Sequence, residues 1–194
     1  NCYSANNNLL ENHKMEVNED FKTLLFIGRF DKVKGIDILL NVFTDYINET
    51  QSKLKLKLIG GGLEMDLVKK YESESIIVKE FVQPEFLIEE VKDVQGFILP
   101  SISEPWGVVI HEMAAAGLPL LVSDVCGANS VFAIHNYNSF IFKANDEIEL
   151  RNAIEKFDST SNSELIKMGK RSKVLSKKIN PEISAASLMS IKLK

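Results

Sequence analysis

The sequence predicts an α/β fold, namely a Rossmann-like, doubly wound parallel sheet of about six strands with helices on both faces. Short apolar segments alternate with segments of helical periodicity along most of the chain. Strands that alternate with helices form parallel sheets, because each helix carries the chain back across one face of the sheet. The length of 194 residues, with 45% hydrophobic and 26% charged residues, suits one globular domain with a sizeable core.

Six strands are expected from the short apolar runs. The first run, T-L-L-F-I-G, contains four consecutive large apolar residues, as in a strand that is buried on both faces. In the second run, leucines alternate with lysines before Leu58 and Ile59. The expected strands cover residues 23–28, 54–60, 75–79, 96–100, 118–123 and 139–143.

The helices between these strands are predicted from apolar residues that recur at helical spacing. Between the first two strands, Ile36, Leu39, Leu40, Phe43 and Ile47 would lie on one face of a helix. The expected helices cover residues 36–47, 62–71, 84–91, 107–116, 147–157 and 163–176. Residues 1–20 are polar, rich in asparagine and aperiodic, so we expect a linker or a disordered segment there and one domain over residues 21–194.

Charge and cysteine content exclude several classes of protein. The net charge of −4 gives no overall attraction to nucleic acid. Cys2 and Cys126 lie far apart, which predicts reduced thiols in a cytoplasmic protein. The first residues do not resemble a signal peptide, and no apolar run is long enough to cross a membrane. His13, His111 and His135 are scattered, so no metal site is expected.

The loop after the first strand contains two cations. Ligands of doubly wound sheets bind at the carboxyl ends of the strands, so the loops that follow the strands are the candidate binding region. The first of them, G-R-F-D-K-V-K-G, carries Arg29 and Lys34. Arg29 as a planar fork and Lys34 as a point charge are suited to bind a diphosphate. The alternative interpretation is a pair of solvated surface charges.

Three consecutive glycines, residues 60–62, follow the second strand and precede a predicted helix. They allow an anion to approach the backbone N–H groups at the start of that helix. The pattern is not G-x-G-x-x-G, so it does not indicate a dinucleotide-binding fingerprint. A tight turn explains the three glycines equally well when they are taken alone.

The loop after the fourth strand combines two carboxylates with a helix start. Glu104 lies in the loop, and Glu112 lies about one and a half turns into the next helix. Because that helix is otherwise apolar, Glu112 must face a rim or a ligand. Glu104 suits sugar hydroxyls, Glu112 suits ribose hydroxyls, and the N–H groups near Gly107 and Val108 suit phosphate. The alternatives are a solvent-facing Glu112, an ordinary loop acid at 104, and a surface or core role for His111.

Together these motifs resemble those of glycosyltransferase family 4, a family of retaining enzymes with the two-domain GT-B fold. The resemblance runs from about Phe21 to the end of the chain. Residues 28–35 resemble the family's diphosphate-binding loop, G-R-F-x-x-x-K-G. Glu104 and Glu112 reproduce its two glutamates with seven residues between them, beside P-W-G and H-E-M-A-A-A-G-L-P. Residues 127–142 resemble the segment that ends in the family's next strand.

The resemblance implies that this chain is the C-terminal, nucleotide-sugar-binding half of a GT-B enzyme, with UDP or GDP in the donor. Arg29 and Lys34 would neutralise the diphosphate, and Glu104 would bind the transferred sugar; these three are the catalytic candidates. Glu80 stands where the family usually has a glycine beside the base-binding edge. The donor-binding candidates are Gly28, Gly61, Phe81, Val82, Trp106, Gly107, Val108, Val109 and Glu112.

The resemblance also implies a metal-independent reaction without a cofactor, since fixed cations stabilise the leaving group. A glycan or lipid-linked glycan acceptor would bind to a second, N-terminal domain that is absent here, so the isolated domain is expected to be nearly inactive. The family's usual role suggests bacterial surface polysaccharide synthesis. Two alternative functions are a non-catalytic nucleotide-binding module and a nucleotide-sugar epimerase of the same architecture.

The last third of the chain contains a basic segment, residues 167–178, with six lysines or arginines. Leu165, Met168 and Leu175 would lie on its apolar side. The segment suggests either peripheral contact with anionic lipid at the inner face of the cell membrane or an ordinary solvated helix face. Residues 183–193 resemble the family's terminal helix, which crosses back to the other domain.

Overall fold

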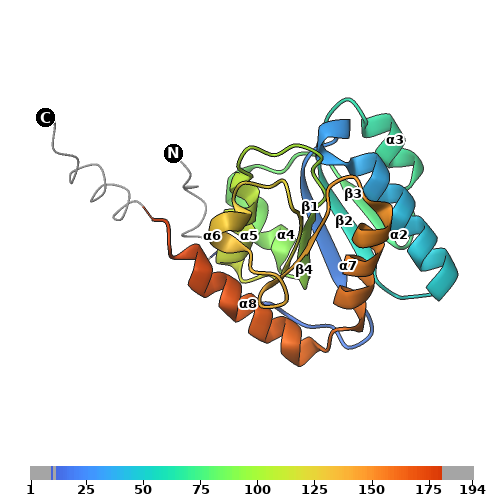
Figure 1. The fold of residues 1–194 in the computed structure, drawn as a ribbon. Helices are drawn as coiled ribbons and strands as arrows, with labels where there is room; N and C mark the ends of the chain where they lie inside the picture. Colours follow the sequence, from blue (N-terminus) through green and yellow to red (C-terminus); the bar gives the residue numbers. More distant parts are fainter. Residues whose placement is uncertain (1–9, 11, 181–194) are drawn as a thin grey trace, which may run out of the picture.

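The computed structural model describes residue 10 and residues 12–180, which form a three-layer α/β domain (Figure 1). At its centre is a parallel sheet of six strands in the order β3-β2-β1-β4-β5-β6. Every neighbouring pair of these strands is parallel, so the predicted fold class is confirmed. The strands are β1 (Thr23–Arg29), β2 (Lys55–Gly61), β3 (Ile76–Lys79), β4 (Gly96–Leu99), β5 (Leu120–Ser123) and β6 (Ser139–Phe142).

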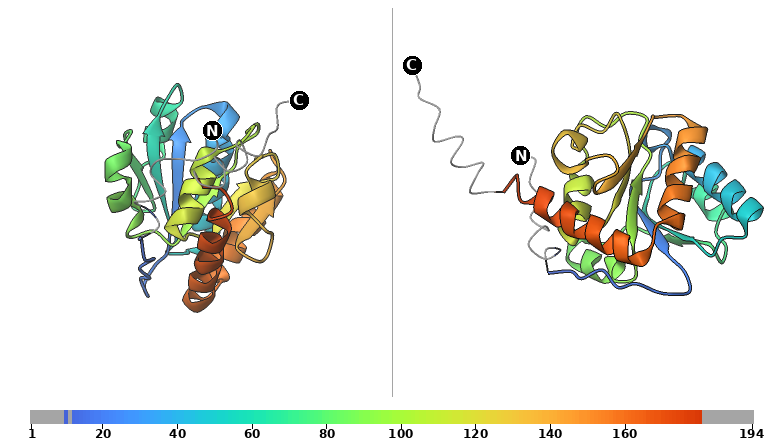
Figure 2. Two further views of the ribbon diagram at one scale, coloured as in Figure 1. Left: turned by 90° about the vertical axis from the view of Figure 1, so that its left-hand side faces the viewer. Right: turned by 60° about the horizontal axis from the view of Figure 1, so that its bottom comes forward.

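Helices cover both faces of the sheet, as Figure 2 shows. On one face α2 contacts α3 and α7, and on the other face α5, α6 and α8 contact one another. The α-helices are α2 (Ile36–Thr50), α3 (Met65–Lys70), α4 (Leu87–Val91), α5 (Val108–Ala116), α6 (Asn129–Phe132), α7 (Glu147–Ser159) and α8 (Asn162–Ser176). Two 3-10 turns are η1 (Lys32–Lys34) and η2 (Pro84–Phe86).

The elements bury the apolar residues that predicted them. β4 and β5 are buried along their whole length, as expected for central strands covered on both faces. Side-chain caps fix two helix starts: Asp146 accepts the N–H groups of Ile148 and Glu149 at the start of α7, and Ser161 accepts that of Glu164 in α8. On α2 the buried residues are Ile36, Leu39, Leu40, Val42, Phe43 and Tyr46.

α2 and α7 end three and two residues later than predicted, and other differences concern α3, α4 and α6. α3 begins at Met65 rather than at residue 62, because the Gly62 carbonyl accepts the Met65 N–H in a tight turn. The helix predicted over residues 84–91 starts with the 3-10 turn η2 and becomes α-helical at Leu87. The sequence does not predict the short helix α6, which has one turn and follows a loop of small residues.

The described part of the expected linker packs against the domain. Residues 12–20 contain no helix or strand, yet Leu10 and His13 are buried. The His13 Nδ1 donates to the carbonyl of Ala116 at 2.7 Å, at the end of α5, and Lys173 of α8 donates to the His13 carbonyl. The Gln95 side chain donates to the Glu16 carbonyl at 2.5 Å. This part of the segment therefore differs from a detached linker.

Burial of His13 makes the stability of the domain depend on pH. Burial lowers the pKa of His13 below its ordinary value of 6.5. The hydrogen bond to Ala116 raises this pKa, but the effect of burial is larger. The unfolded state therefore binds more protons than the folded state once the pH falls below about 6.5, and stability decreases there. In urea titrations between pH 7.5 and 5, we expect the wild type to lose more unfolding free energy than His13→Gln. Equal losses in the two proteins would exclude this role.

Among residue 10 and residues 12–180, no helix is both long and apolar enough to cross a membrane. Cys126 is a buried free thiol. Cys2, the remainder of the expected linker and the predicted terminal helix at residues 183–193 lie outside the described residues.

Candidate functional site

A cleft of about 480 Å³ lies at the carboxyl ends of the first three strands. The ends of β1 and β2 form part of its lining, the segment after β3 supplies another part, and α5 contributes one carboxylate. The lining is largely apolar with two charged groups, which is the usual composition of a small-molecule site. The lining residues are Ile27, Gly28, Arg29, Ile59, Gly60, Gly61, Phe81, Val82, Leu87 and Glu112.

The absence of a side chain at position 60 lets two strand ends approach each other. A Cβ atom at Gly60 would lie 1.9 Å from the carbonyl oxygen of Gly28, and the Gly60 φ is +157°. Beyond this point, the Phe30 N–H donates to the Gly61 carbonyl at 2.8 Å, and the Glu64 N–H donates to the Phe30 carbonyl at 2.9 Å. The loops after β1 and β2 are thus fixed to each other where they border the cleft.

The side chain of Arg29 is 77% exposed at the cleft. Its Nη2 lies 3.2 Å from the Asp31 carboxylate, which is largely buried. Asp31 also caps η1, because its side chain accepts the Lys34 N–H at 3.0 Å. The Asp31 carboxylate therefore holds both the Arg29 guanidinium and the backbone of η1. It contacts only some of the five N–H donors of the guanidinium.

Lys34 and Glu104 form an ion pair between the loops after β1 and β4. Their side chains are only 19% and 11% exposed, so water screens this pair much less than a surface pair. The Ile102 N–H donates to the Val33 carbonyl at 2.8 Å and reinforces the same junction. The structure thus places Lys34 and Glu104 together, outside the lining of the cleft.

The loop after β4 is also joined to the loop after β5. The Gly127 N–H donates to the Glu104 carbonyl at 3.2 Å, and the Ala128 N–H donates to the Trp106 carbonyl at 2.9 Å. Cys126 is buried beside Glu104, and this burial raises its thiol pKa to about 11. This environment favours the protonated thiol, which is a weaker nucleophile than a thiolate.

Helix α5 begins at Val108, directly after the loop that carries Glu104. Its N-cap is Gly107, which makes no side-chain cap hydrogen bond, and the first N–H groups of the helix carry the partial positive charge of its dipole. Trp106 is half-buried, and its ring meets Phe132 of α6 edge to face at 6.3 Å. Val108 is 40% exposed and Val109 is half-buried.

The two neighbours on α5, His111 and Glu112, differ in their surroundings. His111 is buried, stacks on Phe132 at 4.2 Å, and donates through Nε2 to the Ser176 carbonyl at 2.8 Å. It therefore joins α5 to α6 and α8, which is the core role left open by the sequence. Glu112 is half-buried and reaches the cleft. Glu112, an acidic residue on a largely apolar helix, thus borders a cleft that is large enough for a small-molecule ligand.

Most of the sequence-predicted site residues gather at this end of the sheet. The structure places Trp106 to Val109 at the start of α5, and Lys34 with Glu104 beside it. Sequence reasoning missed Ile27, Ile59 and Leu87 as lining residues, because apolar residues in strands and helices are usually assigned to the core. The sequence-predicted site residues that line the cleft directly are Gly28, Arg29, Gly61, Phe81, Val82 and Glu112.

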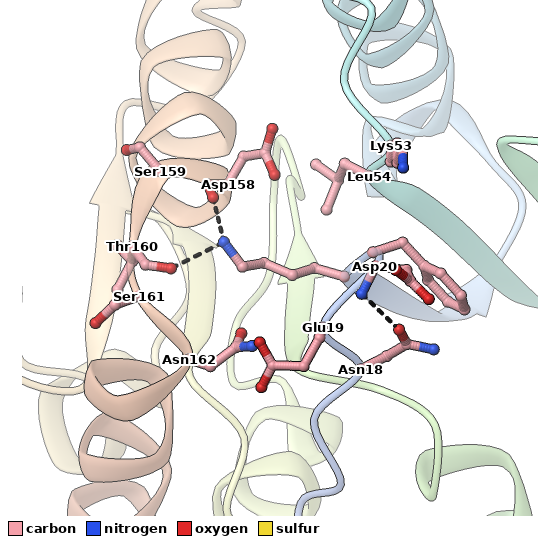
Figure 3. Close-up of a pocket in the computed structure, with 12 residues that line it drawn as sticks. Asn18, Glu19, Asp20, Lys53, Leu54, Asp158, Ser159, Thr160, Ser161 and Asn162 are labelled. Atoms are coloured by element: carbon pink, nitrogen blue, oxygen red, sulfur yellow. Dashed lines mark hydrogen bonds between the residues drawn. The ribbon is translucent and has the colours of Figure 1, made fainter.

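A second hollow of about 320 Å³ lies at the opposite, amino-terminal edge of the sheet (Figure 3). It is bordered by residues 18–22, which precede β1, and by the end of α7. The Lys22 Nζ donates to the carbonyls of Asp158 and, at 2.8 Å, Thr160. These bonds satisfy carbonyls at the end of α7, so we assign Lys22 a structural role there.

Across residue 10 and residues 12–180, no group of three or more His, Cys, Asp or Glu side chains could hold a metal ion. The expectation of a metal-independent reaction does not follow from this finding and stays a prediction. Four of the charged groups at the carboxyl edge form two ion pairs, Arg29 with Asp31 and Lys34 with Glu104.

Comparison with protein families matches residues 10–179 to the model described as "Glycosyl transferases group 1". Two uncharacterized glycosyltransferases of Methanocaldococcus jannaschii are similar in sequence. One is 31% identical over an alignment of 116 residues that covers 57% of this chain and 29% of the relative. The other is 30% identical over an alignment of 173 residues that covers 84% of this chain and 45% of the relative.

Two solved structures share the fold of this chain. TarM superposes with a TM-score of 0.80 at 17% identity, covering 92% of this chain and 36% of TarM. Anabaena HepE in complex with UDP and glucose superposes with a TM-score of 0.72 at 18% identity, covering 89% of this chain and 49% of HepE. The chain spans less than half the length of each of these four proteins.

Proposed function

The chain belongs to the group 1 family of glycosyl transferases, and from this we propose that it is the donor-binding domain of a retaining enzyme that uses a nucleoside diphosphate sugar. The observation that carries the proposal is the cleft at the carboxyl edge, where an apolar lining is bordered by Arg29 and Glu112. A nucleoside diphosphate needs these groups: an apolar wall for the base, a carboxylate for the ribose hydroxyls, and a cation for the phosphates.

The proposed pose runs from the base at Phe81 to the sugar at Glu104. Phe81 is 69% exposed beside Val82, so the base can stack on a ring that costs little to desolvate. Glu112 accepts hydrogen bonds from the ribose, and Arg29 binds the diphosphate. Glu104 accepts hydrogen bonds from the hydroxyls of the transferred sugar.

Catalysis in this proposal consists mainly of stabilising the departing nucleoside diphosphate. Negative charge grows on the diphosphate as its bond to the sugar breaks, and Lys34, Arg29 and the start of α5 surround that position with fixed positive charge. The N–H groups at Trp106 to Val109 support the phosphates and the sugar. Since these groups are fixed by the fold, we propose that the reaction needs neither a divalent metal nor a cofactor.

The acceptor belongs to another part of the whole protein in this proposal. The chain spans less than half of the relatives it matches, and we propose that an N-terminal domain binds a glycan or a lipid-linked glycan. Bacterial surface polysaccharide synthesis in the cytoplasm is the proposed setting. An uncharacterized protein in the cps region of Klebsiella pneumoniae, 30% identical over 118 residues, supports that choice.

Calorimetric titration with UDP and with GDP tests the donor site. We expect Glu112→Gln to weaken binding of the preferred nucleotide by at least about ten-fold, because a charged acceptor for two ribose hydroxyls becomes a neutral amide. Glu155→Gln is the matched control, since Glu155 is an exposed carboxylate on α7. Unchanged affinity in Glu112→Gln, measured also in the full-length protein, would refute the proposed ribose contact.

A further inference from the structure

The outward face of α8 concentrates positive charge. Residues 162–178 contain six basic residues and one acidic residue, in a chain whose net charge is −4. The structure divides the six basic residues into two groups according to their contacts. Arg171 and Lys173 are half-buried, whereas the other four, Lys167, Lys170, Lys177 and Lys178, are exposed.

The two half-buried basic residues are occupied within the domain. Arg171 donates to Glu164 at 2.9 Å and to the Tyr137 carbonyl at 2.9 Å, with its guanidinium 4.7 Å from the Tyr137 ring centroid. Lys173 donates to the His13 carbonyl and packs against Gly117. These contacts hold α8 to the loop after α6 and to the N-terminal segment.

The four exposed lysines share one face with Val174. Lys170 lies three residues after Lys167 and Val174 four residues after Lys170, and Lys177 and Lys178 lie three and four residues after Val174, so all five lie on the same side of α8 and the turn that follows it. We call these five residues the lysine face. The buried residues of α8 lie on the opposite side: Leu165, Met168, Gly169, Ser172, Leu175 and Ser176.

Apolar side chains accompany the positive charge. Val174 in the centre of the lysine face is 67% exposed. Ile134 and Tyr137, in the loop that Arg171 holds against α8, are 47% and 43% exposed. Glu164, the one acidic residue of the segment, lies on the flank of the face and contacts Lys167 at 3.3 Å as well as Arg171.

We propose that the lysine face docks on an anionic lipid bilayer, with α8 parallel to the membrane surface. Lysines whose stems extend along an apolar surface bind lipid headgroups while the apolar residues between them enter the interface. The combination of exposed lysines with Val174, Ile134 and Tyr137 favours a bilayer over a free polyanion, which would use the charges alone. This inference goes beyond the proposed donor site, because none of these residues lines the cleft.

Co-sedimentation with lipid vesicles tests the proposal. The full-length protein is mixed with phosphatidylcholine vesicles with or without about 30% phosphatidylglycerol. We expect binding only to the anionic vesicles, and we expect replacement of all four exposed lysines by glutamine to lower the partition coefficient by about 100-fold, since each lysine contributes several-fold. Val174→Ser should lower it several-fold without changing binding to inorganic polyphosphate.

The matched control replaces Lys53, Lys69, Lys70 and Lys92 by glutamine, which removes the same charge from exposed positions elsewhere. Thermal melts and nucleotide titration verify that both quadruple variants fold and keep the donor site. Equal loss in the two quadruple variants would overturn the proposal, because net charge alone would explain binding. Absence of binding by the wild type would overturn it as well, and so would full binding by Val174→Ser, which would indicate a polyanion site.

Discussion

Replacing Lys34 by methionine in the full-length enzyme is expected to lower kcat by about 10²- to 10³-fold with a smaller effect on KM. A fixed ammonium that acts on the charge of the leaving diphosphate contributes mainly in the transition state, where that charge is largest. Methionine retains most of the aliphatic stem and removes the charge. The partner carboxylate of Glu104 is 11% exposed, so its loss of a counter-ion also lowers stability.

Two further variants separate catalysis from folding. Lys32→Met removes an exposed lysine from the same turn, η1, and should retain wild-type kcat. The double variant Lys34→Met/Glu104→Gln replaces the ion pair by two uncharged side chains. We expect this variant to recover stability in urea titrations while its kcat stays low. Initial rates at varied donor concentration give kcat and KM for each protein. A Lys34→Met enzyme with kcat within about three-fold of wild type would contradict the proposed role.

The Lys34–Glu104 pair illustrates what sequence can and cannot predict about this site. Both residues could be selected from their motifs, because each motif is a local pattern at the carboxyl end of a strand. Their direct contact depends on β1 and β4 being neighbours, which no local pattern specifies. The same holds for Leu87, which lines the cleft although it lies in a helix after β3.

Strand positions could be predicted closely because buried parallel strands are continuous apolar runs. Helix bounds were less accurate where backbone hydrogen bonds decide them, as in the turn between Gly62 and Met65 that delays α3. The basic segment shows a third limit. Its charge is evident in the sequence, but only the contacts of Arg171 and Lys173 reveal which of the six residues remain exposed on one face.

Gly127→Ala is expected to lower the free energy of unfolding by about 2–4 kcal/mol and to weaken donor binding as well. A Cβ atom at this position would lie 2.2 Å from the carbonyl oxygen of Pro105, which is backbone and cannot rotate away. The loop after β4, which is joined here to the loop after β5, carries Glu104 and leads directly into α5. Relief of the clash must therefore move the chain that positions both the sugar-binding carboxylate and the helix start.

Gly61→Ala provides the stability control, because a Cβ atom there would meet only the Met65 Cε, at 3.9 Å. Urea titration should show a loss within about 1 kcal/mol for Gly61→Ala, as expected for a substitution without a steric clash. Titration of Gly127→Ala with the preferred nucleotide, below the urea concentration at which the variant unfolds, measures the expected loss of donor affinity. A Gly127→Ala variant as stable as the wild type would indicate that the loops after β4 and β5 are not in contact. The contact at Gly127 would then not determine the position of Glu104.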